Sequence, residues 1–469
     1  MVAQISSIGF PVPRVVSTVI TGAKQSPATF QPSTRVTLSD ASDEINAIYN
    51  IGAQKLRTSA TSSNSQLAYL MSANLHQPVS VSFQGLGKAL LLQLKDDPKD
   101  FSSAVASSVD VQVSGDNDKA AAVALGIVTQ SGVKVSVSLS RQQDGIVAQV
   151  QTSHGDLDEN EVLAISGLAD AFQAALDGLS AQPPVVSIDG LTQFDNTILK
   201  SVDLNTDVRQ GNDSLQSLNY QSDNVSRGLS YKDSSVSFQL NTDLSHPEVL
   251  GTYGQQVRAL SAYEQQLDSA SFRGRGDKAQ MDMFKTTFRA MNSHYGSNEI
   301  DSSQKTIFMS ESDKARTYQS GLADFSASFQ QAETSSNPLK KDEKDTFAYN
   351  FSQTTEESSN SRGELSQRVQ NTKSHLQASY HEALDPTVPL SLGMLELSQS
   401  YTYHQINDES SSQTVLDFRK GFLATVASSK TTHNMELVKK YVSGRLVDEN
   451  RTPYDNEKTH QLQLKQFSF

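Results

Sequence analysis

The sequence predicts a β-rich α+β protein, and three patterns support this class. Segments that alternate apolar and polar residues recur along most of the chain, as in strands that bury one face. One apolar segment with helical spacing follows the first group of strands and ends at Pro183-Pro184. Further helical patterns interrupt later strands that are long and polar. The expected architecture is an antiparallel meander covered by one long helix, followed by a region of long polar antiparallel strands interrupted by a helical hairpin.

Composition narrows the range of functions. Only 36% of the 469 residues are hydrophobic, cysteine and tryptophan are absent, and serine is the most abundant residue. Without cysteine the chain has no disulfides, thiolate metal ligands or cysteine nucleophiles. Its net charge of −13 would repel a phosphate backbone, so nucleic acid is not an expected partner. The 19 Phe and 14 Tyr residues supply enough anchors for a folded chain with a thin core.

The first part of the chain is expected to hold a flexible tail and one globular domain. Residues 1–40 are punctuated by four prolines and are expected to be the tail. Residues 41–190 are expected to form an α+β domain, with strands over about 79–150 and a helix over about 157–179. The helix would cover the apolar face of the strands. Its apolar residues fall three or four apart: Val162, Ile165, Leu168, Ala169, Phe172, Leu176 and Leu179.

The rest of the chain is expected to divide into three regions. Residues 195–245 are expected to form a strand pair, 246–296 helical segments, and 300–469 a β-rich C-terminal region. The segments 201–208 and 237–244 resemble each other, which indicates either a duplicated strand within one sheet or chance similarity in a repetitive background.

No catalytic motif is found in the sequence. The nearest match to a zinc-protease helix is His381-Glu382, but Asp385 stands where the second histidine is required. We therefore expect no cofactor, and no residue is assigned a catalytic role.

A weak metal site is the one ligand pattern that the sequence offers. Asp203, Asn205 and Asp207 match the opening of a calcium loop, but the glycine and glutamate that such a loop needs later are missing. Together with Asp243, they are weak candidates for an external cation site. The alternative is that these residues form turns and protect strand edges.

The C-terminus predicts an interaction site. Leu462, Leu464, Phe467 and Phe469 alternate with polar residues at the end of the chain. An exposed edge strand of this kind invites pairing with another strand. We therefore expect protein partners or self-association.

Membrane and export signals are weak. No apolar run approaches the roughly 20 residues of a spanning helix, so no transmembrane helix is expected. The first residues also lack the pattern of a cleaved secretion signal. The serine-rich, cysteine-free composition is typical of exported surface and appendage proteins. The expected location is extracellular or at the cell surface without a cleaved Sec signal, with the cytoplasm as the alternative.

These observations favour a non-enzymatic structural or interaction protein, exported or associated with a surface or appendage, that assembles through strand edges. Two alternatives stay open. One is a secreted effector or hydrolase with a site built from dispersed Asp, Glu and His residues. The other is a small-ligand or lipid binder that uses the sheet face.

Overall fold

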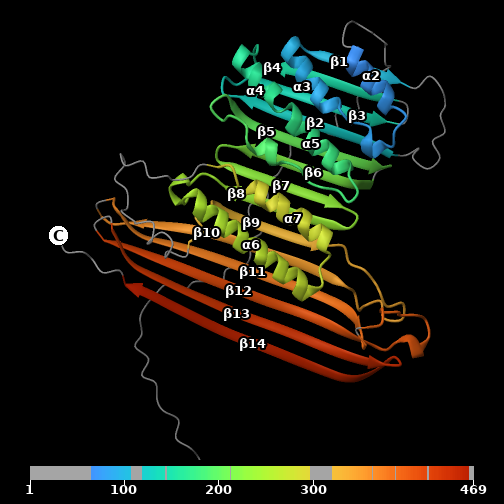
Figure 1. Cartoon of the computed structure of the whole chain (residues 1–469), viewed down its shortest axis with the longest axis vertical. Helices are drawn as coiled ribbons and strands as arrows, with labels where there is room; N and C mark the ends of the chain where they lie inside the picture. Colours follow the sequence, from blue (N-terminus) through green and yellow to red (C-terminus); the bar gives the residue numbers. More distant parts are fainter. Residues whose placement is uncertain are drawn as a thin grey trace, which may run out of the picture. The chain divides into compact units, whose positions relative to one another are not determined.

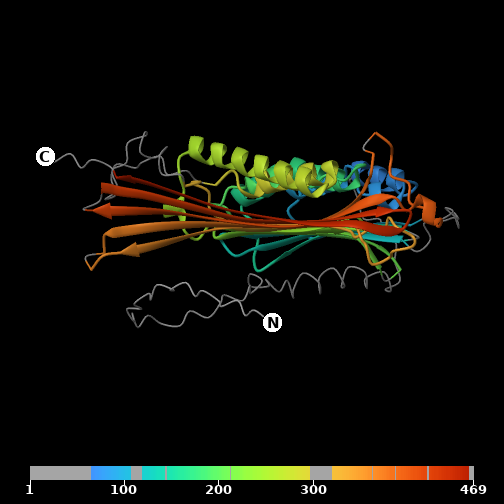
Figure 2. The ribbon, with the colours of Figure 1, turned by 90° about the horizontal axis from the view of Figure 1, so that it is seen from below.

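The computed structural model describes residues 65–106, 119–142, 145–211, 213–295, 319–361, 363–385, 387–419 and 422–463. These residues belong to one compact unit and form a β-rich α+β structure. All fourteen strands join one antiparallel sheet in the order β1-β4-β3-β2 and then β5 to β14 in sequence. The helices lie on one face of this sheet, here called the helical face (Figure 2). The expected tail at 1–40 lies outside the described residues.

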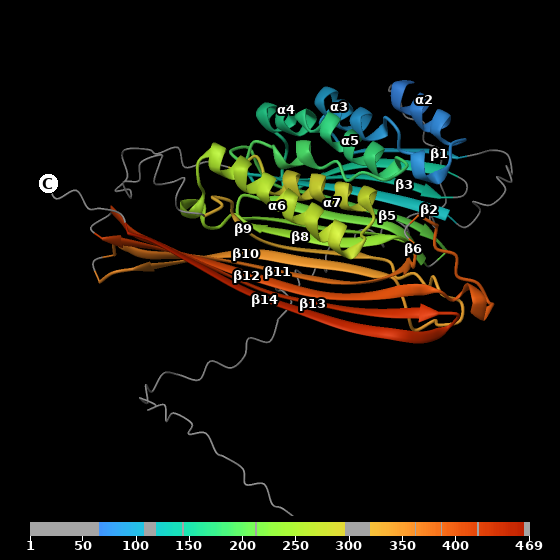
Figure 3. The same cartoon turned by 60° about the horizontal axis from the view of Figure 1, so that its bottom comes forward.

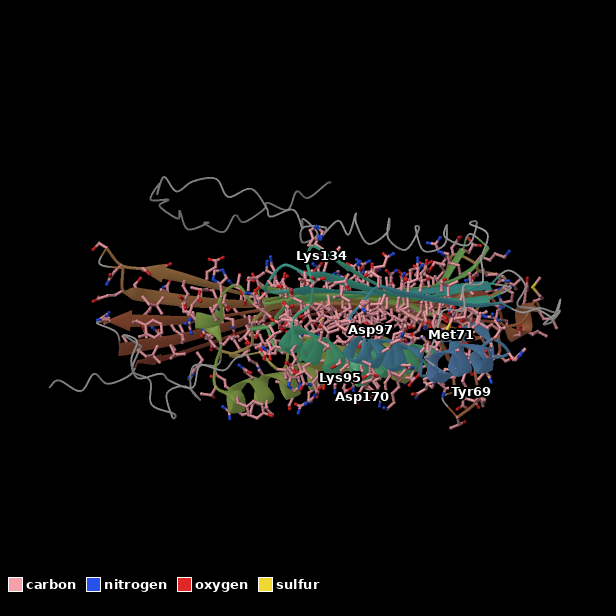
Figure 4. The ribbon with its side chains drawn as sticks, turned by 90° about the horizontal axis from the view of Figure 1, so that it is seen from above. Tyr69, Met71, Lys95, Asp97, Lys134 and Asp170 are labelled. Atoms are coloured by element: carbon pink, nitrogen blue, oxygen red, sulfur yellow. The ribbon has the colours of Figure 1, made fainter. Side chains whose placement is uncertain are left out.

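The first part of the sheet is built from β1 to β4. Strands β2, β3 and β4 follow one another as antiparallel neighbours, and β1 pairs with the outer side of β4. Figure 4 shows the side chains that fill the space between these strands and the helices, with Lys134 on the opposite face. The elements of this part are α2 Ser65–Asn74, η1 Val79–Val81, α3 Leu86–Asp96, β1 Phe101–Ala106, β2 Lys119–Thr129, β3 Lys134–Gln142, β4 Gly145–Ser153, α4 Glu159–Gly167, α5 Ala169–Ser180 and η2 Asp189–Thr192.

The structure differs from the expectation of strands beginning near residue 79. Residues 79–81 form a short 3₁₀ helix and Leu86–Asp96 forms helix α3. The buried residues Leu86, Leu90 and Leu94 lie four apart, which places them on one side of a helix. Because this apolar stretch is short, its helical spacing was not separable from that of a buried strand.

The expected covering helix is present as two helices, α4 and α5, that meet at Leu168. Asp158 begins α4, because its side chain accepts a hydrogen bond from the Glu161 backbone while the Glu161 carboxylate accepts one from the Asp158 backbone. Phe172 in α5 is fully buried and packs against Gly87 of α3. This segment therefore packs helix on helix as well as helix on sheet.

Four strands, rather than one strand pair, occupy the region expected at 195–245. The two similar segments lie in β5 and β8, which belong to the same sheet but are separated by β6 and β7. Sequence patterns missed β6 and β7 because few apolar residues mark them, chiefly Leu218, Tyr220, Leu229 and Tyr231. The bounds are β5 Leu199–Gln210, β6 Asp213–Asp223, β7 Ser226–Asp233 and β8 Val236–Asp243.

Two long helices cover the middle of the sheet. Helix α7 packs on β8 and α6 on β11 (Figure 1). An aromatic cluster fills the interface. The rings of Tyr263 and Phe325 lie 5.1 Å apart between their centres. The Phe288 ring lies at the same distance from Phe325 and from Phe351. The elements here are η3 Pro247–Val249, α6 Tyr253–Gly274, α7 Lys278–Met291, β9 Asp324–Gln331 and β10 Thr346–Ser359.

The last four strands are the longest in the described sheet. Figure 3 shows β12 to β14 continuing the sheet beyond the helices. Their bounds are β11 Leu365–Ala383, β12 Tyr401–Arg419, β13 Phe422–Val442 and β14 Arg445–Gln463, with the short helix η4 Glu396–Ser398 between β11 and β12.

Candidate interaction surface

Strand β14 forms one edge of the sheet. It pairs with β13 on one side, and no described strand lies on its other side. Between Arg445 and Gln461 every side chain is exposed except that of Asn456, which is half-buried. The opposite edge, β1, has 6 residues, against 19 in β14. The outer side of β14 is therefore the longer of the two exposed backbone edges.

The hydrogen bond of Met435 shows which way the backbone of β14 points at Pro453, the residue opposite it. The Met435 backbone N–H donates to the Asp408 carboxylate on β12, at 3.2 Å, so it points away from β14. Pro453 lies opposite Met435. Residues directly opposite each other in an antiparallel ladder either exchange both backbone hydrogen bonds or make none, and the two kinds of pair alternate along the strand. Because the Met435 N–H points away from β14, Met435 and Pro453 make none with each other. The nitrogen of Pro453 therefore faces outward, where no N–H is needed for the sheet.

The same alternation identifies the other outward-facing groups of β14. The register with β13 is continuous from Asp448 to Gln463. Backbone groups at Arg451, Asp455, Glu457 and Thr459 therefore point outward, as at Pro453. They provide donors and acceptors that another strand can use.

The middle of β12 to β14 is polar on both faces. Since neighbouring side chains point to opposite faces, three consecutive residues sample both. No apolar side chain occurs in these rows, so this part of the sheet is held by its backbone ladder rather than by a core. The rows are Ser410, Ser411 and Ser412 in β12, Thr432, Thr431 and Lys430 in β13, and Asn456, Glu457 and Lys458 in β14.

A charged network attaches helix α6 to these polar strands. The Arg273 guanidinium donates to Asp408 at 3.1 Å and to Glu436 at 2.6 Å, and His404 Nδ1 lies 2.9 Å from Glu436. Burial raises the pKa of Glu436, but the hydrogen bonds from Arg273 and His404 outweigh it and hold the pKa below its ordinary value. In the adjacent turn, Arg275 donates to Glu382 at 2.7 Å. The end of α6 thereby holds β11, β12 and β13 together.

A second cluster, which sequence analysis missed, lies at one end of the same strands. The His381 side chain is fully buried, with Nδ1 2.6 Å from Asp345 and Nε2 3.4 Å from Glu343. The hydroxyls of Tyr401 and Tyr441 donate to Glu343 at 2.6 and 2.8 Å. Burial, together with Glu343, raises the pKa of both tyrosines. His381 Nδ1 and both tyrosine hydroxyls have hydrogen-bond partners within the cluster, whereas His381 Nε2 is buried without one among the described residues.

The charges around His381 also affect Asp345. Burial would raise the pKa of this carboxyl, but hydrogen bonds from His381 and Ser336 outweigh burial and lower it. The only advance signal of this cluster is the alternation of Tyr401 and Tyr403, which places both on one strand face. Residues 336–345 come from a connection that sequence patterns do not align with β11.

An exposed apolar patch lies beside the turn between β13 and β14. Leu395 and Leu397 are 73% and 83% exposed, and Met394 is 72% exposed. The Gly444 N–H of the turn donates to the Gln399 carbonyl at 2.8 Å, which holds this loop against the strand ends. The patch adjoins the beginning of β14.

The predicted cation residues are distributed over two separate strands. Asp203, Asn205 and Asp207 alternate along β5, whereas Asp243 ends β8. Asp207 accepts a hydrogen bond from Ser214 at 2.7 Å. Asp243 accepts from the Ser245 N–H at 2.9 Å, as expected for a turn residue. Within the described residues no group of three His, Asp or Glu side chains is arranged to hold a metal. The cation site remains a prediction.

The predicted C-terminal interaction residues fall partly outside the described chain. Leu462 lies in β14, where its backbone pairs with Val426 of β13. Leu464, Phe467 and Phe469 lie outside the described residues. What the structure adds is the rest of β14, which sequence analysis did not single out as an edge.

A small cavity lies between the sheet and its helices. A cavity of about 30 Å³ lies between η1, α5 and strands β2, β5 and β6, with Phe83, Val123 and Leu179 in its lining. This volume holds one or two waters rather than an organic ligand.

Among the described residues, the segment Glu159–Ser180 is long and apolar enough to cross a membrane by length and composition. Its apolar residues Ile165, Phe172 and Leu176 pack in the core, which accounts for this composition.

Comparison with known proteins found no match to any family model, curated protein or solved structure.

Proposed function

We propose that this protein is a structural or interaction protein that assembles through the outer edge of β14. The observation that carries the proposal is the 19-residue strand at the end of the sheet, exposed along its length and without a described neighbour on its outer side. Its outward N–H and C=O groups gain hydrogen-bond partners when the backbone of another strand pairs there. The partner is a copy of this chain or another protein.

The polar faces of β12 to β14 support this role. The middle of these strands, which is polar on both faces, gains no core stabilisation, so the length of this part has another use. The charged network at Arg273 and the cluster at His381 hold β11, β12 and β13 together, and β14 pairs with the last of these strands. Such reinforcement presents the edge in a fixed, extended form, which lowers the entropy cost of binding.

The edge carries features that limit uncontrolled pairing. Pro453 removes one outward donor, and charged side chains such as Arg451 and Glu457 stand along the strand. Such residues guard natural sheet edges against aggregation. Assembly through β14 is therefore selective and reversible in this proposal. Its setting is extracellular or at a cell surface, in keeping with the serine-rich composition and the absence of cysteine.

The experiment that tests the proposal blocks the edge without disturbing the β13 ladder. Because the Thr459 N–H points outward, Thr459→Pro removes an outward donor and leaves the hydrogen bonds to β13 intact. Sedimentation velocity and electron micrographs of the unmodified chain should show particles larger than a monomer. Thr459→Pro adds a second outward proline and should shift the population toward monomers, whereas the control Thr459→Ala, which keeps its N–H, should assemble normally.

Two outcomes overturn the proposal. The unmodified chain remaining a monomer at all concentrations would remove the assembly role. Thr459→Pro assembling as well as Thr459→Ala, with unchanged circular dichroism, would move the contact to another surface.

A further inference from the structure

The symmetry of two identical sheets restricts how β14 could pair with its own copy. For two antiparallel edge strands the two-fold axis stands perpendicular to the sheet, so both helical faces lie on the same side. Residues that face each other must then point to the same face of the joined sheet. Only registers that match odd positions with odd and even with even meet this condition.

Among the registers whose axis lies at or next to Tyr454, the middle residue of β14, charge selects one. With the axis at Tyr454, Arg451 faces Glu457 of the second copy, and Asp448 faces His460 of the second copy. No like charges stand directly opposite each other in this register. Moving the axis to Pro453 sets Glu449 against Glu457, and moving it to Asp455 sets that carboxylate against its own copy. Like charges directly opposite are destabilising.

The residue on the axis also fits a self-contact. Tyr454 is 55% exposed although it is a large aromatic side chain in a strand. Because outward backbone groups belong to Pro453 and Asp455, the two Tyr454 residues form a pair without mutual backbone hydrogen bonds, in which side chains approach most closely. Two tyrosine rings would then cover each other at the centre of the contact.

Pro453 sets the strength of this contact. It lies opposite Asp455 of the second copy, to which it cannot donate, while its carbonyl still accepts from the Asp455 N–H. Each copy thus loses one hydrogen bond beside the axis and keeps those of Arg451, Glu457 and Thr459. The contact is weakened but not prevented, as expected for a reversible dimer.

We propose that two copies of this chain pair antiparallel through β14, with the two-fold axis at Tyr454, to form a closed dimer with one continuous sheet. This inference rests on the proposed function and adds the partner and the register. An isologous contact of this kind uses up the β14 edge of both copies, so it ends at two copies and does not extend into a fibre.

Cysteine crosslinking tests the register directly, because the chain contains no cysteine of its own. In a pair of this type the Cα atoms lie about 4.5 Å apart, within the range of about 4.4–6.8 Å that a disulfide spans. Tyr454→Cys should therefore form a disulfide dimer under mild oxidation. Thr452→Cys should not, because Thr452 faces Asn456 of the second copy rather than itself. A mixture of Thr452→Cys and Asn456→Cys chains should crosslink.

Charge exchange provides a second readout that leaves Tyr454 in place. Glu457→Arg sets two arginines against each other at two symmetric positions and should weaken the dimer by about tenfold or more in sedimentation. Adding Arg451→Glu restores opposite charges and should restore the dimer. Glu409→Arg makes the same change of charge two strands inside the edge and should have no effect.

The outcomes separate this inference from the function on which it rests. The register would be wrong if the chain assembles but Tyr454→Cys forms no disulfide dimer, or if Glu457→Arg and Arg451→Glu leave the assembly unchanged. Assembly through β14 would still stand. Particles that grow beyond two copies through β14 would overturn the closed dimer. A chain that stays monomeric would overturn both.

Discussion

Gly87→Ala gives a direct test of the packing between α3 and α5. A methyl group at this position would lie 2.9 Å from two ring atoms of Phe172 and 3.0 Å from Leu176. Carbon atoms in a packed interior approach each other to about 3.5–4.0 Å. Phe172 is fully buried and Leu176 nearly so, so neither side chain has room to move aside. The two helices must separate to admit the methyl group.

Two opposing effects set the size of the change. Alanine favours a helix interior over glycine by about 1 kcal/mol. Overpacking a well-filled core costs about 1–3 kcal/mol, and three short contacts place this site at the upper end. We therefore expect Gly87→Ala to lower the free energy of unfolding by about 2 kcal/mol. Denaturant unfolding followed by circular dichroism measures this difference.

Gly167→Ala is the matched control. Gly167 also lies in a helix, at the end of α4, but no atom lies within 4 Å of the methyl group that alanine would add. The free energy of unfolding of Gly167→Ala should stay unchanged or rise slightly. In a Phe172→Leu background the Gly87→Ala penalty should shrink, because the ring that it meets is gone. Equal stabilities for Gly87→Ala and Gly167→Ala would refute the close contact between α3 and α5.

Three further predictions concern the charged groups. Arg273→Met should lower the free energy of unfolding by about 2 kcal/mol, because it removes the guanidinium that Asp408 and Glu436 share. Arg289→Met removes an exposed ion pair with Glu264 and should lower it by under about 1 kcal/mol. Equal costs would show that the network does not hold α6. The pKa of Glu436 is lowered on folding, so its contribution is present above about pH 4.5 and is lost as pH falls through the lower, folded value. Stability should therefore decline at acid pH, less steeply in Arg273→Met; parallel pH profiles would contradict this linkage. Dialysis against a chelator should leave the thermal midpoint unchanged, and a drop that calcium reverses would establish a cation site.

Parts of the fold follow from the sequence because the local signal is strong. The alternation in β2 to β4 and the helical spacing around Phe172 reflect residues that bury one face against a cover. Apolar spacing does not identify an element where the apolar run is short or where a strand has few apolar residues. Leu86, Leu90 and Leu91 form so short a run that strand and helix are not distinguishable. The strands β6 and β7 carry too few apolar residues to stand out from the polar background.

The interaction surface was harder to predict for a physical reason. Whether a strand lies inside a sheet or at its edge depends on long-range pairing, which no local pattern encodes. The sequence drew attention to Leu462 and the residues after it, whereas the exposed edge begins at Arg445. The His381 cluster likewise joins residues from four separate segments. Pro453 is a sequence feature that indicates this edge, since proline inside a strand is typical of an edge strand.

Hydrogen–deuterium exchange in β14 tests the central claim most directly. Amides at Arg451, Asp455, Glu457 and Thr459 point outward and should exchange rapidly in a monomer. At concentrations where sedimentation shows assembly, we predict that peptides from 445–463 exchange more slowly, while peptides from β2 remain unchanged. Exchange in 445–463 that stays equally fast in the assembled state would contradict assembly through this edge.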